Sequence, residues 1–315
     1  MKLIIQIPCY NEAESLPATL SCLPREVVGF DVVEWLIIDD GSKDGTDLVA
    51  RRCGVDHVIH HQFNQGLAAA FMTGLESCLR LGADVIVNTD ADNQYDARDI
   101  PGLTTPVIEG RAEIVIGSRP ISVISHFSPL KKIFQRIGSW VVRAASGTSV
   151  ADAPSGFRAF SRFAAERLIV FNDYTYTLET IIQAGQQGMK LVSVPIRVNR
   201  DMRPSRLVKS IPSYIQRSVV TIVRIFVIYR PFRFFSIVGL SLFTLGLILG
   251  LRFLFLFLLG FGSGNIQSLI LASVLLVIGF QSFLVAFVAD LLAANRFLLQ
   301  DIRFKINRLD RDSRR

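Results

Sequence analysis

The pattern of hydrophobic and polar positions divides the chain into an alternating first part and a continuously apolar second part. Between residues 2 and 198, short β-rich runs alternate with helix-like stretches such as 68–81 and 133–145. Uninterrupted apolar strings such as Val85-Ile86-Val87 are typical of strands covered on both faces by helices, in a mostly parallel sheet. Ligands bind such sheets at the carboxyl ends of the strands. The runs that predict strands are 3–8, 34–38, 57–59, 84–89, 113–117 and 191–194.

The second part contains two apolar stretches, at about 234–259 and 266–289, that we predict to be transmembrane helices joined by a tight turn. Each exceeds the roughly 20 residues that a helix needs to cross a bilayer. The alternative is a buried helix pair of a soluble protein, which is disfavoured because soluble helices rarely run so far without a polar face. Arg252 interrupts the first stretch near its far end, where it could snorkel to the interface or contact a lipid phosphate or a partner.

The charged residues are distributed unevenly along the chain, and their distribution indicates which partner the chain has. The 315-residue chain has a formal net charge of +7, which by itself suits either nucleic acid or an anionic membrane. Residues 1–196 are acidic, however, with 17 Lys and Arg against 22 Asp and Glu, and the basic excess lies in 197–233 and 296–315. Basic segments on both sides of the apolar stretches predict that both termini and the domain before the spans lie on the cytoplasmic side, and nucleic acid is not expected as a partner.

The expected organisation is therefore an α/β catalytic domain followed by membrane-associated segments. In the segment before the spans, Arg217 and Arg224 share one face, which favours an interfacial helix over a short third span. The start of the chain predicts no signal peptide, and four cysteines without paired spacing exclude a disulfide scaffold or zinc module. The predicted parts are a catalytic domain (1–200), basic juxtamembrane and interfacial helices (201–233), two spans (234–295) and a basic cytoplasmic tail (296–315).

Polar residues follow four of the predicted strands. Each group alone is compatible with a turn or a helix cap, but polar side chains after the first, second, fourth and fifth predicted strands together indicate a ligand site. The groups are Pro8-Cys9-Tyr10-Asn11-Glu12, Asp39-Asp40-Gly41-Ser42, Asp90-Ala91-Asp92-Asn93-Gln94 and Ser118-Arg119.

The third group predicts a divalent cation site. Asp90 and Asp92 can direct carboxylates at one hard cation, and Gln94 can add an amide oxygen. Mg²⁺ or Mn²⁺ would complete its coordination with water and substrate phosphates, and would neutralise charge on a leaving nucleoside diphosphate. Asp39 is placed like an acceptor for a nucleobase or ribose. The sequence has no P-loop and no G-x-G-x-x-G fingerprint.

Together with Asn64-Gln65-Gly66, Gly117-Ser118-Arg119 and Ser155-Gly156-Phe157-Arg158, these groups resemble the family 2 glycosyltransferases of GT-A fold over about residues 3–210. Within that family the sequence is most similar to the polyprenyl-phosphate glycosyltransferases, which include dolichyl-phosphate mannose synthases and undecaprenyl-phosphate sugar transferases. The two-span hairpin resembles one subclass of this group. The Q-x-x-R-W motif of processive polysaccharide synthases is absent.

The resemblance implies a role for each matching position. Asp92, Arg119 and three basic residues that face the lipid phosphate are implied to be catalytic, and a juxtamembrane segment is implied to close on the donor diphosphate. The implied nucleotide-sugar contacts are Pro8, Tyr10, Asn11, Glu12, Asp39, Asp90, Ala91, Asp92, Arg119, Arg203 and Lys209; the metal contacts are Asp90, Asp92 and Gln94; the lipid-phosphate contacts are Lys131, Lys132 and Arg136; and Arg200 and Arg206 complete the juxtamembrane set.

A polyprenyl phosphate acceptor also suits the available chemistry. An attacking hydroxyl needs a general base, whereas a phosphomonoester is already mostly dianionic near neutral pH and needs cations instead. We therefore expect inverting transfer of a sugar from a GDP- or UDP-linked donor to a polyprenyl phosphate. Asp152 and Glu179 would orient the sugar, or would be a helix cap or surface carboxylates. Transfer to another lipid or glycan hydroxyl and a catalytically dead membrane scaffold are the alternatives, and homo-oligomerisation stays open.

Overall fold

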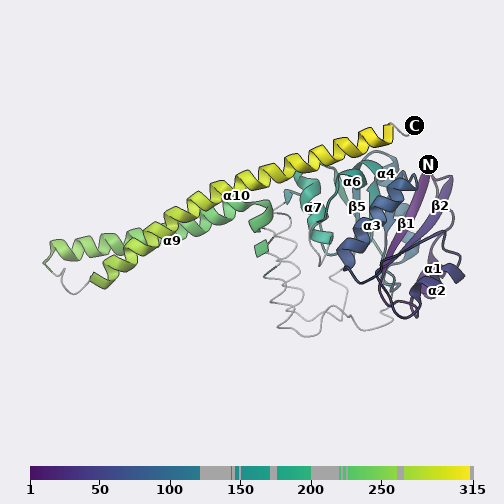
Figure 1. Ribbon diagram of the computed structural model, residues 1–315, viewed down its shortest axis with the longest axis horizontal. Helices are drawn as coiled ribbons and strands as arrows, with labels where there is room; N and C mark the ends of the chain where they lie inside the picture. The colour runs from purple at the N-terminus through teal and green to yellow at the C-terminus, as the bar shows by residue number, and fades with distance from the viewer. Residues whose placement is uncertain are drawn as a thin grey trace. The chain divides into compact units, whose positions relative to one another are not determined.

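The computed structural model describes residues 1–120, 143, 146–148, 150, 151–170, 176–199, 220, 223–224, 226–260 and 266–312, and within 297–312 it describes the side chains of residues 298, 299, 302, 305 and 306. The chain falls into two compact units, Met1–Ser218 and Val219–Arg315. The first contains the sheet with its helices, and the second contains two long helices (Figure 1).

The first unit is built on a seven-stranded sheet with the order β3-β2-β1-β4-β6-β5-β7. All neighbouring strands run parallel except β6, which is antiparallel to β4 and to β5. The predicted mostly parallel α/β fold is thus confirmed. The strands are β1 (Lys2–Cys9), β2 (Val32–Asp39), β3 (His57–His60), β4 (Val85–Asn88), β5 (Ile114–Ser118), β6 (Arg158–Ser161) and β7 (Leu191–Pro195).

Strand β6 was not predicted from the pattern of apolar runs. It has only four residues, Arg158-Ala159-Phe160-Ser161, and two of them are polar. Strand β6 runs antiparallel to β4, and this direction puts Arg158 opposite Asn88 at the carboxyl end of β4. The residues just before β6 therefore reach the same edge of the sheet as the residues just after β4.

Helices cover both faces of the sheet. Leu3, Ile5 and Ile7 of β1 belong to a buried cluster that includes residues of α1 and α4, whereas α3 packs closely on the opposite face. There a Cβ atom at Gly74 would lie 2.5 Å from Oε1 of Gln6, so any larger residue would displace the buried Gln6 side chain. The helices are α1 (Leu16–Cys22), α2 (Thr46–Arg52), α3 (Leu67–Arg80), α4 (Ile100–Ile108), α6 (Arg162–Arg167) and α7 (Thr177–Gln186), with a short 3-10 turn at Ala97–Asp99.

The predicted helix at 68–81 corresponds to α3. Of the helix predicted at 133–145, the structure describes only residue 143, so that prediction falls almost entirely outside the described residues.

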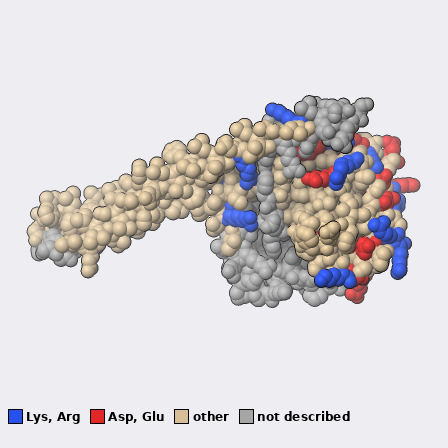
Figure 2. All heavy atoms as spheres, viewed as in Figure 1, with Lys and Arg blue, Asp and Glu red and all other residues tan. Residues whose placement is uncertain are grey.

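The second unit is a pair of apolar helices, α9 (Pro231–Leu258) and α10 (Ile266–Asp312). Pro231–Leu258 and Ile266–Arg296 are long and apolar enough to be candidate membrane spans, and most of their side chains face outward. Figure 2 shows an almost uncharged surface along this pair. Arg252 is exposed, six residues before the end of α9. Helix α10 continues through much of the stretch predicted as a basic tail, as far as Asp312.

Small residues line the contact between the two helices. Gly239 and Gly246 of α9 are seven residues apart, as are Ala272, Gly279 and Ala286 of α10, and all five are buried. A seven-residue spacing keeps one face of each helix against the other, and small residues allow apolar helices in a membrane to approach closely. At Gly279 an added Cβ would lie 2.8 Å from the backbone nitrogen of Phe243 and 3.0 Å from the carbonyl oxygen of Gly239.

We expect Gly279→Ala to destabilise the hairpin by about 1–3 kcal/mol, because backbone atoms must move to admit the methyl group. Gly250→Ala is the matched control, since its Cβ would meet only the Cβ of Ala272 at 3.9 Å. Both changes gain the same helix propensity of about 1 kcal/mol. Thermal unfolding of the full chain in detergent micelles, followed by circular dichroism, measures the difference. A midpoint for Gly279→Ala as high as that for Gly250→Ala would contradict the packing described here.

Candidate functional site

The ends of β1, β2, β4 and β5 meet at one edge of the sheet, together with the start of β6. Parallel pairing sets Cys9 beside Asp39 and Gln6 beside Asn88, and antiparallel pairing sets Ile116 beside Arg158. The predicted groups after these strands therefore begin at one edge, as the sequence pattern indicated.

The loops after β1 and β2 are braced against each other. The backbone N–H of Asn11 donates to Oγ of Ser42 at 2.8 Å, and the N–H of Lys43 donates to Oδ1 of Asn11 at 2.9 Å. The N–H of Glu12 donates to Oγ1 of Thr46 at 3.0 Å. Asn11 has a φ of 53°, a left-handed conformation that asparagine tolerates better than most residues. The two predicted nucleotide-binding groups thus form one interlocked structure.

The other predicted residues of the first group differ in exposure. Pro8 is buried, whereas Tyr10 is 43% exposed and its ring is accessible to a ligand. The carboxylate of Glu12 accepts a hydrogen bond of 2.6 Å from Oγ of Ser15.

Two histidines hold the acidic pair after β2, and the sequence analysis did not identify them. Asp39 is fully buried; its Oδ1 accepts the N–H of Ser42 at 3.1 Å, and its Oδ2 lies 2.8 Å from Nδ1 of His60. A ligand can reach Asp39 only if the side chains that cover it, including His60, move aside. The pairing of β2 with β3 puts His60 next to Asp39, a contact that no motif in the sequence marks.

The adjacent Asp40 has a structural role. Its Oδ1 lies 2.8 Å from Nδ1 of His61 and accepts the N–H of Gln65 at 2.9 Å, while its Oδ2 accepts the N–H of Gly66 at 2.8 Å. Asp40 therefore fixes the Asn64-Gln65-Gly66 turn that leads into α3.

Asp90 and Asp92 follow β4 and influence each other electrostatically. Burial, and then the charge of Asp92, raise the pKa of Asp90 to about 7, against the opposing effects of Arg119 and of a hydrogen bond with the Tyr95 hydroxyl. Oδ1 of Asp92 accepts the N–H of Gln94 at 3.1 Å. A divalent cation between the two carboxylates would favour the charged form of both, so the pair fits Mg²⁺ or Mn²⁺.

Among the described residues, no group of three or more His, Cys, Asp or Glu side chains could hold a metal ion. A cation at Asp90 and Asp92 would therefore take its remaining ligands from amide, water or substrate oxygens, as Mg²⁺ commonly does. Gln94 contacts Asp92 and Asn199 through its backbone N–H and carbonyl groups, and the role of its side chain stays a prediction.

Asp90 sits against Gly156, in the loop just before β6. An added Cβ at Gly156 would lie 3.0 Å from both carboxylate oxygens of Asp90 and 3.0 Å from the Tyr176 hydroxyl, so any side chain would displace one of them. The Gly156 N–H donates to the hydroxyl oxygen of Tyr95 at 3.0 Å. Asn88 donates to the carbonyl of Gly156 at 2.9 Å and to the Tyr176 hydroxyl at 2.8 Å. Tyr95 and Tyr176 are thus site residues that the sequence analysis missed.

Arg158 holds the loop before β6 in place from inside the domain. It is fully buried and donates to the carbonyl oxygens of Ala153, Ser155 and Thr177 and to Oγ1 of Thr180. Burial lowers the pKa of Arg158 to about 10, so it is charged at neutral pH. Its charge also lowers the pKa of Asp90.

Arg119 forms a two-pronged ion pair with Asp152. Its Nε lies 2.7 Å from Oδ2, and one terminal nitrogen lies 3.0 Å from Oδ1. Burial opposes the charge of Arg119, but Asp152, Tyr95 and Asp90 together raise the pKa of Arg119 above its usual value. Asp152 has no exposed surface, and both of its carboxylate oxygens contact Arg119. Glu179 is buried in the first turn of α7.

Several predicted residues lie outside the described residues, and their roles stay predictions. They are Lys131, Lys132, Arg136, Arg200, Arg203, Arg206 and Lys209.

Comparison with known proteins gives matches over most of the first unit. The profile described as "Glycosyl transferase family 2" matches residues 4–169. The chain is 32% identical over 218 residues to an undecaprenyl-phosphate mannosyltransferase of Micrococcus luteus, covering 66% of this chain and 88% of that protein. It is 31% identical over 213 residues to a UDP-N-acetylglucosamine–dolichyl-phosphate N-acetylglucosaminyltransferase of Methanococcus voltae, covering 61% and 83%. A polyprenol monophosphomannose synthase of Mycolicibacterium smegmatis is 29% identical, with coverage of 61% and 76%.

Among solved structures, the fold is similar to that of glucosyl-3-phosphoglycerate synthase from Mycobacterium tuberculosis. The TM-score is 0.54 at 19% identity, over 70% of this chain and 79% of that one. That enzyme was crystallised with Mn²⁺, UDP and glucosyl-3-phosphoglycerate. The likeness confirms the GT-A-like arrangement of the sheet domain.

We expect Asp152→Asn to destabilise the sheet domain by about 3 kcal/mol, because it leaves the largely buried Arg119 without a compensating charge. Glu109→Gln is the control, since it breaks an ion pair with Arg111 in which both side chains are exposed. Fluorescence of the buried Trp35 during thermal unfolding of the full chain reports on this domain. Equal midpoints for the two variants would show that the Arg119–Asp152 pair is not needed for stability.

Proposed function

Because the chain belongs to glycosyl transferase family 2, we propose that it moves a sugar from a nucleoside-diphosphate sugar to a polyprenyl phosphate, with inversion, at the cytoplasmic face of a membrane. The observation that carries this proposal is the Asp90–Asp92 pair at the carboxyl edge of the sheet, beside the ion-paired Arg119. The names of the curated relatives, which include undecaprenyl-phosphate and dolichyl-phosphate transferases, support the acceptor class.

The donor would lie along the carboxyl edge of the sheet. The exposed ring of Tyr10 and the interlocked loops after β1 and β2 would hold the nucleoside, with Asp39 contacting base or ribose once His60 has moved. Asp90, Asp92 and Gln94 would bind Mg²⁺ or Mn²⁺, which would neutralise the charge that develops on the departing diphosphate. The base could be guanine or uracil.

The remaining groups would bring two anions together. Two hydrogen bonds to Asp152 restrict the Arg119 side chain to one conformation. Its positive charge would therefore stay in a fixed position beside the reaction centre. A guanidinium has five N–H donors, and the contacts with the Asp152 side chain use two of its donor groups. The predicted cations Lys131, Lys132, Arg136, Arg203 and Lys209 would add to this positive field. A phosphate acceptor is already ionised, so the residues need to position it and not to deprotonate it.

The two candidate spans would anchor the domain where the acceptor lies. Basic residues flank the apolar stretches on both sides, at 197–233 and 296–315, which favours a cytoplasmic position for both ends. A polyprenyl phosphate could then present its headgroup at the membrane surface while its tail stays in the bilayer.

The test is transfer by the full chain in membranes or nanodiscs, supplied with undecaprenyl phosphate and a panel of GDP- and UDP-linked sugars. We expect one donor to yield a glycolipid that mild acid cleaves, because a sugar phosphodiester is acid-labile. A product stable to mild acid would indicate transfer to a hydroxyl instead. Absence of product with every donor, while the donors also fail to stabilise the protein thermally with Mn²⁺, would support a catalytically dead scaffold.

Removal of the cation should abolish transfer without unfolding the protein. We expect chelator, or Asp92→Asn, to lower the rate by about 100-fold or more, in the range seen when a group that stabilises developing charge is lost. Glu109→Gln, at an exposed site, is the charge-matched control and should keep wild-type activity. Full activity in excess chelator would refute a role for the metal.

A further inference from the structure

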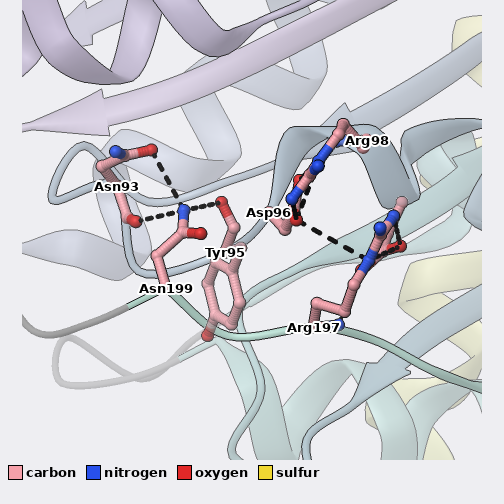
Figure 3. A network of polar contacts seen from close by, with 7 residues as sticks. Asn93, Tyr95, Asp96, Arg98, Arg197 and Asn199 are labelled. Carbon is pink, nitrogen blue, oxygen red and sulfur yellow. Dashed lines mark hydrogen bonds and ion pairs between the residues drawn. The ribbon is translucent and has the colours of Figure 1, made fainter.

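The segment after β7 lies along the loop that carries the two carboxylates. Val198 pairs antiparallel with Tyr95, the N–H of Asn199 donates to the carbonyl of Gln94 at 2.9 Å, and the N–H of Asp96 donates to the carbonyl of Arg197 at 3.4 Å. Figure 3 shows these two segments and the side chains that join them. We call residues 197–199 the strap.

The side chain of Asn199 spans the turn in this loop. Its Nδ2 donates to the carbonyl oxygen of Asn93 at 2.9 Å and to that of Tyr95 at 3.2 Å (Figure 3). The distance from the same Nδ2 to Oδ1 of Asn93 is 3.5 Å. Asn93 has a φ of 56°, which is uncommon for a residue other than glycine. One amide group thus holds both sides of a left-handed turn.

That turn sets the position of both acidic side chains. On one side it carries the N–H of Gln94, which donates to Oδ1 of Asp92. On the other side it carries Tyr95, whose hydroxyl forms a hydrogen bond with Asp90 and accepts the N–H of Gly156. A shift of the carbonyl groups of Asn93 and Tyr95 would therefore move a partner of each carboxylate.

We propose that Asn199 is a positioning residue for the cation site, acting through the Asn93–Tyr95 turn on Asp90 and Asp92. The inference rests on the proposed function, because that function requires a cation at these carboxylates. Neither the motifs nor the apolar runs single out Asn199, since it lies more than 100 residues from Asp92 in sequence.

The same strap makes a second contact that provides a control. Arg197 lies 2.5 Å from Oδ1 of Asp99 and 3.6 Å from Oδ2 of Asp96, and Asp96 also pairs with Arg98. These ion pairs hold the strap to the 3-10 turn at Ala97–Asp99, beyond Tyr95 (Figure 3). Loss of Arg197 would loosen the strap but would leave the hydrogen bonds to Asn93 and Tyr95 in place.

The deciding experiment compares Asn199→Asp with Arg197→Gln in the full chain. Both variants lower the net charge by one on the same strap, but only Asn199→Asp replaces the donor group with an oxygen that faces the carbonyls of Asn93 and Tyr95. Binding of Mn²⁺ alone is measured by electron paramagnetic resonance of the free ion, and thermal unfolding is measured in parallel. We expect Asn199→Asp to weaken Mn²⁺ binding by about 10-fold, as is typical when a partner that orients a metal ligand is lost, and Arg197→Gln to bind close to wild type.

Asn199→Ala removes the donor without adding charge, so it decides the matter if Asn199→Asp fails to fold. Unchanged Mn²⁺ affinity in folded Asn199 variants, or equal weakening by Arg197→Gln, would overturn the inference while leaving the proposed function intact. A wild-type protein that binds no Mn²⁺, either alone or together with GDP or UDP, would overturn both the inference and the metal role in the proposed function.

Discussion

Burial of the Asp90 carboxyl group, next to the charge of Asp92, is the constraint around which the edge of the sheet is organised. Burial and the charge of Asp92 raise the pKa of Asp90 to about 7, which means that the protein by itself holds this pair in an unfavourable state. Arg119 and Arg158 offset part of the cost from two sides, the first through a fixed ion pair with Asp152 and the second from a fully buried position. The edge of the sheet thus holds two carboxyl groups whose joint ionisation is disfavoured, at the place where a cation would bind.

Much of the fold could be predicted because buried parallel strands leave a strong signal. The runs at 3–8, 34–38 and 84–89 correspond to β1, β2 and β4, and the polar residues that follow them lie at one edge. Strand β6 could not be found this way, since its four residues carry no long apolar run. Its partners on both sides, β4 and β5, bury it, so burial comes from tertiary pairing and not from local sequence.

The site was harder to predict than the fold, for the same reason. Motif residues such as Asp90, Asp92 and Arg119 stand directly after strands, whereas the groups that orient them come from distant parts of the chain. His60 reaches Asp39 through strand pairing, Asp152 reaches Arg119 across 33 residues, and Asn199 reaches Asn93 across 106. Each is a single polar side chain without a periodic pattern, so only the folded geometry reveals its partner.

The reversed direction of β6 has a consequence for how this domain could diversify. Strand β5 runs toward the ligand edge and ends at Ser118, while β6 begins at Arg158 and runs away from it. The chain between Ser118 and Arg158 therefore begins and ends at the same edge of the sheet. Insertions or deletions between Arg119 and Asp152 would not alter the register of any strand and would keep Arg119, Asp152 and Gly156 in the chain. Variation there could change what is recognised while the paired strands and the acidic pair stay the same.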